Sequence, residues 1–184
     1  QIRLGFADIN DGSPITQISV GEQFLVQGFV KDLREFGTGV FAAYTDVEYP
    51  SSAATVEGVI FYGADYPNGR SGDTSTPGLV DEVGAFDGID RLGPDEKLLF
   101  AVPMRAREAG IFEFEPNQAD ILPQNSVLLF DSSDPVAPEQ IEFRSAELTI
   151  TSQVTNVQLN PNNAMDVNDD TSVALFVFLE QFPF

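Results

Sequence analysis

The side chains in this sequence that could carry out chemistry are almost all carboxylates. The chain has 29 Asp and Glu residues against 9 Lys and Arg, and it has neither His nor Cys. Their absence excludes triads built on His, thiol nucleophiles and ordinary zinc sites. A two-carboxylate glycosidase remains compatible with the composition. However, nearly all the acids fall in expected turns or on outward faces, and pairs such as Asp81-Glu82 arise by chance at this density. We therefore predict that the protein is not an enzyme.

Three oxygen-bearing side chains near the C-terminus have the spacing of the first ligands of a calcium loop. They are Asp166, Asn168 and Asp170. Such a loop also needs Gly at its sixth position and a bidentate acid at its twelfth, where this chain has Thr171 and Val177. We expect calcium to bind here if another segment or subunit supplies the missing carboxylate. The alternative is a polar, Asn/Asp-rich turn that precedes a strand.

Aromatic side chains that could bind a sugar are few. Trp is absent, and 4 Tyr residues remain as candidates for an exposed platform. Tyr62 and Tyr66 bracket the start of a predicted loop, so any glycan-binding role falls to this pair. Most Phe residues occupy alternating positions that we expect to face inward, and we assign them to the core.

The net charge of −20 limits the partners of the protein. A surface this acidic repels nucleic acid and anionic membranes, whereas it suits calcium, basic partners or solubility in salty surroundings. No stretch reaches the ~18 apolar residues of a membrane-spanning helix, so we predict no membrane insertion. The chain begins at Gln1 without Met or a signal peptide, from which we expect a processed or excised segment.

Short stretches of β-forming residues, separated by turn signals, must position these side chains. Within residues 32–50 we predict a central strand, with Val47 and Tyr49 on one face and Asp46 and Glu48 on the other. The pattern predicts an all-β fold, a jelly-roll or immunoglobulin-like antiparallel β-sandwich. The other expected strands are 1–9, 24–30, 54–62, 97–105, 110–115, 126–130 and 140–150.

Residues 63–96 differ in character from the predicted strands. They are rich in Gly and acids and contain Pro67, Pro77 and Pro94. We predict a long loop insertion here, with one helical turn near 79–83. A loop of this length is usually functional or an inserted flap, so we expect specific interactions to involve it.

The last part of the chain differs again, and we predict three segments in total. Residues 1–150 form the sandwich, 151–171 a polar linker with the calcium-type loop, and 172–184 a hydrophobic C-terminal strand. The strand contains seven consecutive apolar residues from Val173 to Leu179. A helix over 166–180 is the alternative, but apolar residues would surround it almost completely. The residues assigned to assembly are Val173, Leu175, Phe176, Val177, Phe178 and Leu179.

Several short motifs carry a resemblance to a known family. The motifs are Gly12-x-Pro14-Ile15-Thr16-x-Ile18-x-Val20-Gly21-Glu22-Gln23-Phe24, Val30-x-Asp32-Leu33-Arg34, Gly39-Val40-Phe41-Ala42-Ala43-Tyr44-x-Asp46-Val47, the stretch 77–86 and Ala119-Asp120. Over about residues 1–150 the chain resembles a repeat module of very large secreted proteins of planctomycete-type bacteria. That module is similar to cohesin-like and carbohydrate-binding-like jelly-roll sandwiches. The tail resembles the start of a degenerate dockerin-type calcium loop.

This resemblance implies an extracellular or cell-surface setting and a scaffolding role, and it brings no catalytic residues. We therefore predict a non-catalytic structural or assembly protein, a surface filament subunit joined through its C-terminal strand. The partners would be copies of the chain or another surface protein. The alternative is a carbohydrate- or protein-binding module of a large surface adhesin, with Tyr62 or Tyr66 at the mouth of a cleft.

Overall fold

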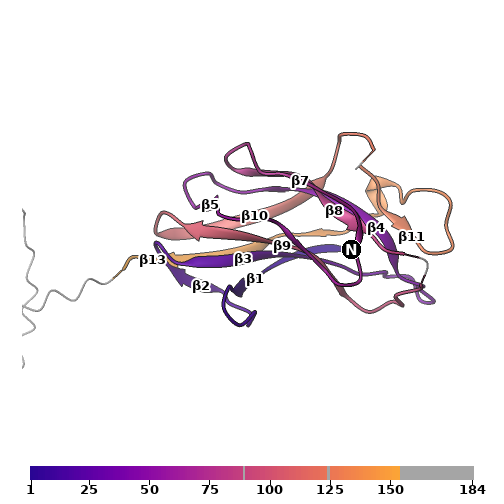
Figure 1. The fold of residues 1–184 in the computed structure, drawn as a ribbon, viewed down its shortest axis with the longest axis horizontal. Coiled ribbons are helices and arrows are strands. Elements are labelled where there is room, and N and C mark those ends of the chain that lie inside the picture. The colour runs from indigo at the N-terminus through magenta and orange to yellow at the C-terminus, as the bar shows by residue number, and fades with distance from the viewer. Residues whose placement is uncertain (89, 124, 154–184) are drawn as a thin grey trace, which may run out of the picture. The chain divides into compact units, whose positions relative to one another are not determined.

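The computed structural model describes residues 1–88, 90–123 and 125–153, in which strands form the two layers of a β-sandwich (Figure 1). Burial alternates strictly along β3 (Gln23–Val30), as expected for a strand with one face on the core. Both sheets are mixed, because β1 pairs with β12 and β2 pairs with β13 in parallel. The predicted all-β sandwich is therefore confirmed. The prediction that its strands pair only in antiparallel fashion is wrong for the pairs β1–β12 and β2–β13.

The first sheet has six strands in the order β12-β1-β3-β9-β5, with β6 also paired to β9. Its centre is the pair β3 and β9, which run antiparallel along their full lengths. The expected strand 54–62 is split into two short strands on the edge formed by β9. Besides β3, the members are β1 (Ile2–Asp8), β5 (Ala54–Val56), β6 (Phe61–Tyr62), β9 (Lys97–Ala106) and β12 (Phe143–Arg144).

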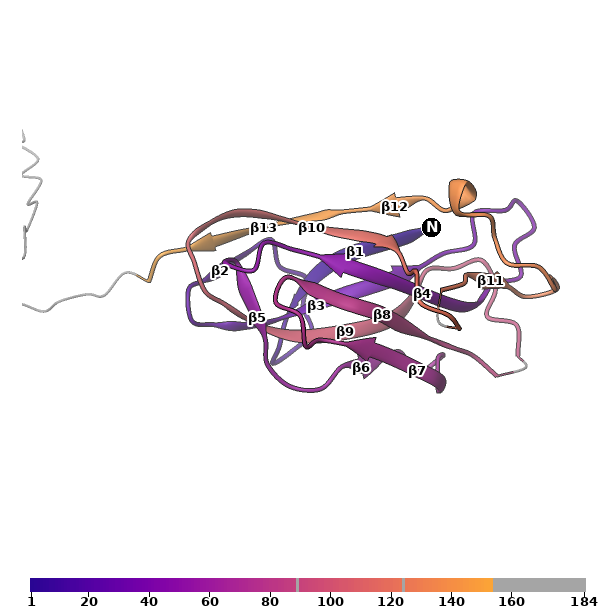
Figure 2. The ribbon, with the colours of Figure 1, turned by 90° about the horizontal axis from the view of Figure 1, so that it is seen from above.

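The second sheet has seven strands in the order β2-β13-β10-β4-β8-β7, with β11 paired to β4. The expected strand 140–150 is divided into a short 3-10 helix (Pro138–Gln140), β12 and β13, which follow one another along one edge in Figure 2. The members are β2 (Gln17–Ser19), β4 (Val40–Glu48), β7 (Asn68–Asp73), β8 (Leu79–Phe86), β10 (Gly110–Gln118), β11 (Leu128–Leu129) and β13 (Ala146–Thr151).

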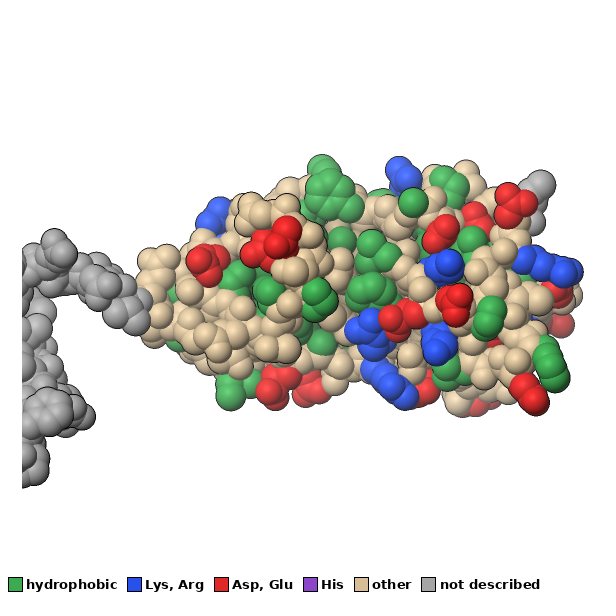
Figure 3. Space-filling view, turned by 90° about the horizontal axis from the view of Figure 1, so that it is seen from below, with side chains coloured by type: hydrophobic (Ala, Val, Ile, Leu, Met, Phe, Trp, Pro, Cys, Tyr) green, Lys and Arg blue, Asp and Glu red, His purple; other side chains and the backbone are tan. Residues whose placement is uncertain are grey.

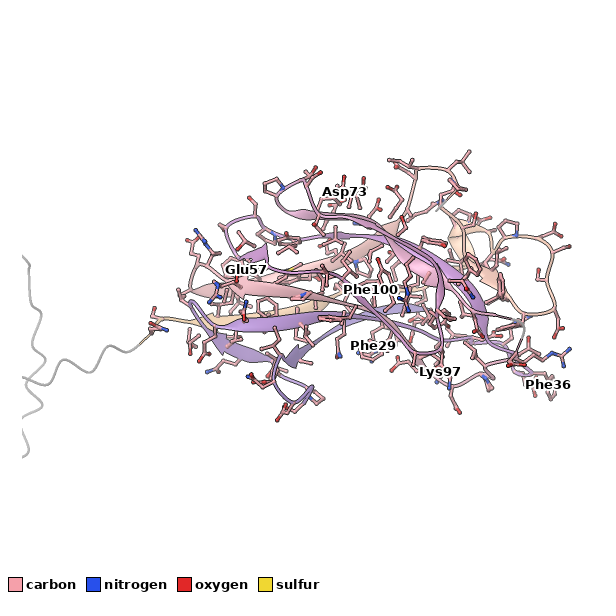
Figure 4. The ribbon with its side chains drawn as sticks, viewed as in Figure 1. Phe29, Phe36, Glu57, Asp73, Lys97 and Phe100 are labelled. Atoms are coloured by element: carbon pink, nitrogen blue, oxygen red, sulfur yellow. The ribbon has the colours of Figure 1, made fainter. Side chains whose placement is uncertain are left out.

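An aromatic cluster joins the two sheets in the core. Phe114 stacks on Tyr49 with ring centroids 5.3 Å apart, and it meets Phe6 edge to face at 5.1 Å. Phe24 packs against the same ring at 6.3 Å. Phe100 lies in the middle of the sandwich (Figure 4), directly opposite Gly28 on β3, where the absence of a side chain leaves room for its ring. Such pairs add packing energy beyond area burial and fix the spacing of the layers.

Residues 63–96 do not form the one long loop that the sequence predicted. It contains β7 and β8, and β8 is an inner strand whose Val80, Val83 and Ala85 are buried in the core. The predicted helical turn at 79–83 is part of this strand. The glycines that suggested a loop instead permit close packing: a Cβ on Gly84 would lie 2.0 Å from the Ala43 carbonyl oxygen. Only the segment after Phe86 remains as a long connection.

The central strand predicted within 32–50 is confirmed as β4. It lies inside the second sheet, between β8 on one side and β10 and β11 on the other. Val47 and Tyr49 face the core, as expected. Within the described residues, no helix is long and apolar enough to cross a membrane.

Candidate functional site

A β-bulge brings the first two carboxylates of a cluster together. Between Thr45 and Val47, the pairing of β4 with β8 shifts register, so that Asp81 and Glu82 stand opposite Asp46 alone. Glu82 has a left-handed backbone with φ of 46°, and its N–H donates to the Asp46 Oδ1 at 2.9 Å. Left-handed backbone is costly for a residue with a side chain, so the surrounding contacts must hold it in place.

Asp120 adds a third carboxylate from the segment that follows β10. The backbone N–H groups of Asp120 and Ile121 donate to Glu82 Oε1 at 3.2 and 2.9 Å, which ties this segment to β8. Carboxylate oxygens of Asp46, Glu82 and Asp120 all lie within 4.8 Å of one another. We call these three residues the acidic trio. Hard cations such as Ca²⁺ take carboxylate oxygens as ligands, so these residues have the chemistry to hold one.

The position of Asp46 within the acidic trio shifts the pKa of its carboxyl. Burial, against the lowering effect of the Glu82 N–H and together with the negative charges of Glu82, Asp81 and Asp120, raises the pKa of its carboxyl to about 6. The side chain of Asp46 therefore gains a proton near neutral pH more readily than an ordinary aspartate. A bound cation would relieve the same repulsion.

Two exposed apolar side chains follow the acidic trio directly. Ile121 and Leu122 are 55% and 76% exposed. Near them, a small apolar cluster of Ala42, Tyr44 and Ala119 covers the outer face of β4, on the side away from the core. Ile121 and Leu122 are therefore exposed apolar side chains beside the carboxylates of the acidic trio, while the small apolar cluster is buried.

A groove of about 430 Å³, lined by both apolar and polar side chains, opens where the two sheets part at one end of the sandwich. Ile2 and Val30 line it from the first sheet, and Val40 and Leu129 line it from the second. Ile2, Val30 and Val40 are core residues that are at most 5% exposed, so the floor of the groove is the core itself. At its rim Leu33 is 54% exposed. We call this the terminal groove.

A buried aspartate fixes the loop that forms one wall of the terminal groove. Asp32 is 3% exposed and pairs with Arg34 at 2.6 Å. Its Oδ2 also accepts a hydrogen bond from the Gly39 N–H at 3.1 Å. The Arg34 guanidinium, together with the N–H groups of Arg34 and Gly39, lowers the pKa of Asp32 to about 2, against the effect of its burial. The loop between β3 and β4 is thus held by a charge that stays ionised at any ordinary pH.

The structure buries Tyr66, one of the two tyrosines assigned to glycan binding, and leaves Tyr62 half-buried. Tyr66 is 0% exposed and donates a hydrogen bond to the Val40 carbonyl, so it belongs to the core and offers no face to a sugar. Tyr62 is half-buried and donates to the Ser71 carbonyl at 2.8 Å, while the Arg70 guanidinium lies 5.4 Å from the centre of its ring.

The other predicted site residues lie outside the described residues. These are the calcium ligands Asp166, Asn168 and Asp170, and the assembly residues Val173, Leu175, Phe176, Val177, Phe178 and Leu179. The predicted linker 151–171, beyond its first residues, and the strand 172–184 also lie there.

Sequence reasoning missed both the acidic trio and the terminal groove. Asp46 and Glu82 are 36 residues apart, and Glu82 and Asp120 are 38 apart, so only the sheet order brings them together. The adjacent acids Asp81 and Glu82 opposite a lone Asp46 are the one sequence signal, and it requires the strand register. The terminal groove depends on where two sheets separate, which no local pattern reveals.

Comparison with solved structures finds cohesin modules. The seventh ScaB type I cohesin of Pseudobacteroides cellulosolvens matches with a TM-score of 0.56 at 9% identity, covering 83% of this chain and 94% of that one. A cohesin–dockerin complex of Clostridium thermocellum matches with a TM-score of 0.56 at 14% identity, covering 82% and 99%. A cohesin module of a Clostridium perfringens family 33 glycoside hydrolase matches with a TM-score of 0.52 at 16% identity, covering 76% and 93%. No protein-family model matches the sequence, and no curated protein matches it.

The likeness shows that the described residues have a cohesin-like fold. At identities of 9% to 16% it concerns the fold alone. The planctomycete-type parentage and the dockerin-type tail stay predictions.

Proposed function

We propose that this chain is a non-catalytic assembly module that acts outside the cell, as a surface subunit joined to neighbouring copies through its C-terminal strand 172–184. Two of the similar solved structures are complexes of cohesins with dockerins, so this fold is used for protein binding in those proteins. The extracellular setting follows from the resemblance to modules of secreted proteins.

The observation that carries the proposal is that the described residues by themselves build a two-layered sandwich with a continuous core. Within these residues, the main core cluster runs from Ile2 to Ile150, and the last strand, β13, ends at Thr151. The two layers therefore close on each other with residues of the described domain. The seven apolar residues from Val173 to Leu179 follow this domain in the sequence.

An apolar run of this kind favours association. A strand-forming segment with free N–H and C=O groups adds readily to an open sheet edge or groove of another molecule. Because the accepting surface and the donated strand are different parts of the chain, the contact is heterologous, and repeated contacts make a filament unless the rotation closes a ring. The polar segment before the strand supplies the connecting length.

Calcium binding at Asp166, Asn168 and Asp170 is the second part of the proposal. Three oxygen ligands alone form an incomplete site, so the missing carboxylate would come from another segment or from a neighbouring copy. Calcium would then stabilise the joined state and have little effect on a single chain. Titration of Ca²⁺ into the full chain and into an Asp166→Asn/Asp170→Asn variant, followed by calorimetry, tests this. Unchanged heats in the variant would place any calcium elsewhere.

The assembly proposal is tested by sedimentation of the full chain and of a chain that ends at Thr171. We expect the full chain to form a concentration-dependent series of species built from the 20.0 kDa subunit, and the shortened chain to sediment as a folded monomer. Far-UV circular dichroism confirms that the shortened chain keeps its β-structure. A full chain that remains monomeric in calcium and in salt would overturn the proposed function.

A further inference from the structure

The terminal groove and the point where the chain leaves the sandwich lie at opposite ends of the described domain. Ile2, at the start of β1, and Val30, at the end of β3, line the groove. Asp8 and Gln23 lie at the other ends of these two strands, and Thr151 pairs with Ser19, the last residue of β2, from which a short turn leads into β3. Seven residues of extended strand separate the two ends, or about 20 Å. Figure 1 shows β11, beside the groove, at one end and the close of β13 at the other.

We propose that the terminal groove is the acceptor for the apolar run Val173–Leu179 of a second copy of this chain. This inference rests on the proposed function and adds the site at which the donated strand docks. Because the described domain ends opposite the groove, we propose that each copy accepts a strand at one end and extends its tail from the other. The resulting filament is polar, with all copies pointing the same way.

The chemistry of the groove matches this occupant. An extended strand presents alternate residues, so Val173, Leu175, Val177 and Leu179 form one purely aliphatic row. The groove, of about 430 Å³, has aliphatic side chains such as Ile2, Val30 and Val40 at its floor and polar side chains at its walls. The floor residues are almost fully buried already, so the driving force comes from burial of the aliphatic row itself and of exposed Leu33 at the rim.

The charges at the groove also suit the tail. The run itself is uncharged, and the residues 154–184 contain acids but no Lys or Arg. The groove lining contains Lys31 and Arg34 together with Asp32 and Asp134, so its charges cancel although the whole chain carries −20. On the face seen in Figure 3, most of the visible Lys and Arg side chains lie in the half of the domain that holds β11 in Figure 1, among Asp and Glu side chains. A groove lining with balanced charges repels an acidic tail less than a lining of acids alone would.

Two full-length variants with complementary defects test the proposal. Leu33→Asp damages the groove and keeps the tail, while Val177→Asp damages the tail and keeps the groove. We expect each variant alone to need at least a tenfold higher concentration to assemble than the wild type. An equimolar mixture should form dimers that grow no further, because only one intact groove and one intact tail can meet. Val59→Asp is the matched control, since Val59 is 72% exposed, lies outside the groove and should assemble normally.

Cysteine cross-linking gives a readout that does not depend on the charged variants folding well. The chain has no Cys, so single cysteines can be introduced without competing thiols. Chains with Leu33→Cys mixed with chains with Val177→Cys should form a disulfide-linked dimer under mild oxidation, and Val59→Cys chains should not.

The outcomes separate the inference from the proposed function. If the wild type assembles while Leu33→Asp also assembles and the cysteine pair stays unlinked, the groove assignment is wrong and the assembly proposal stands. If the wild type is monomeric at every concentration, both fall. A tail that returns to its own groove would give no cross-link between separately labelled chains, and this result also overturns the inference.

Discussion

At the scale of single residues, two aspartates show how the same side chain is tuned in opposite directions. Asp46 is surrounded by carboxylates and backbone that partly bury it, and its pKa rises to about 6. Asp32 is buried beside Arg34 and two N–H groups, and its pKa falls to about 2. Burial opposes ionisation at both positions, so the partners decide the result. Neither environment is readable from the sequence, although both residues lie in or next to a correctly predicted strand.

Replacement of Asp46 by Asn should stabilise the fold at neutral pH. The folded chain holds the Asp46 proton more tightly than the unfolded chain, so the stability of the wild type falls as pH rises from about 4 to 6 and stays lower above that. The Asn side chain removes the charge and keeps the acceptor for the Glu82 N–H. We expect the free energy of unfolding to rise by about 1 kcal/mol at pH 7 and not to change at pH 4. The value is smaller than the full pKa shift implies, because Asp46 is partly exposed to solvent.

Urea unfolding at both pH values measures this effect. Glu48→Gln removes the same charge from an exposed position on the same strand and serves as the control. An equal gain in both variants would show a general charge effect, with no special role for the acidic trio.

Replacement of Asp32 by Ala should have the opposite sign. Removal of this carboxylate breaks the pair with Arg34 and leaves the Gly39 N–H without its acceptor, which should cost about 2 kcal/mol at pH 7. Because the folded-state pKa is depressed, the contribution of Asp32 is present above about pH 4 and is lost as pH falls towards 2. The difference between wild type and variant should therefore shrink in unfolding experiments at pH 3. Asp134→Ala, an exposed acid on the same groove, should change little.

At the scale of elements, the sequence pattern predicted most strands correctly, but the prediction of a loop over residues 63–96 was wrong. Alternation of apolar residues located β1, β3, β4, β9 and β10 because each has one face on the core. It failed at β8, where Gly84 and the acids of the bulge interrupt the pattern. Glycine is common in turns and also occurs in inner strands that pack closely, so a glycine-rich stretch can be either. Only the contacts in the structure distinguish the two. The sequence analysis missed the acidic trio and the terminal groove for a similar reason. Both depend on how strands that are far apart in the sequence are placed in the two sheets.

Gly84 offers a direct check of the β4–β8 pairing. A methyl group there would lie 2.0 Å from the Ala43 carbonyl oxygen and 2.7 Å from the Tyr44 Cα, which are backbone atoms of the neighbouring strand. Gly84→Ala should therefore destabilise the fold by about 3 kcal/mol or more. Thermal unfolding compares it with Gly88→Ala, where an added Cβ meets nothing within 4 Å. Similar melting temperatures for the two variants would contradict the position of β8 as an inner strand.

At the scale of the whole molecule, a net charge of −20 must be reconciled with association between copies. Like-charged subunits repel one another, and salt screens this repulsion within about 10 Å at ~0.1 M. We therefore expect assembly of the full chain to need a severalfold lower protein concentration at ~0.5 M NaCl than at ~0.02 M. Light scattering over a dilution series at each salt concentration measures this. Dissociation on adding salt would indicate that ion pairs, rather than the apolar strand, hold the copies together.

Hydrogen exchange of the full chain at two protein concentrations tests the central claim most directly. The account holds that Val173–Leu179 is donated to another copy. The amides of these residues should therefore be protected at a concentration where the chain assembles and exchange freely after dilution to monomers, while amides of β3 and β9 stay protected throughout. Protection of Val173–Leu179 that is independent of concentration would show a strand folded into its own domain. Free exchange in the assembled state would show that the contact lies elsewhere, and either result would contradict the account.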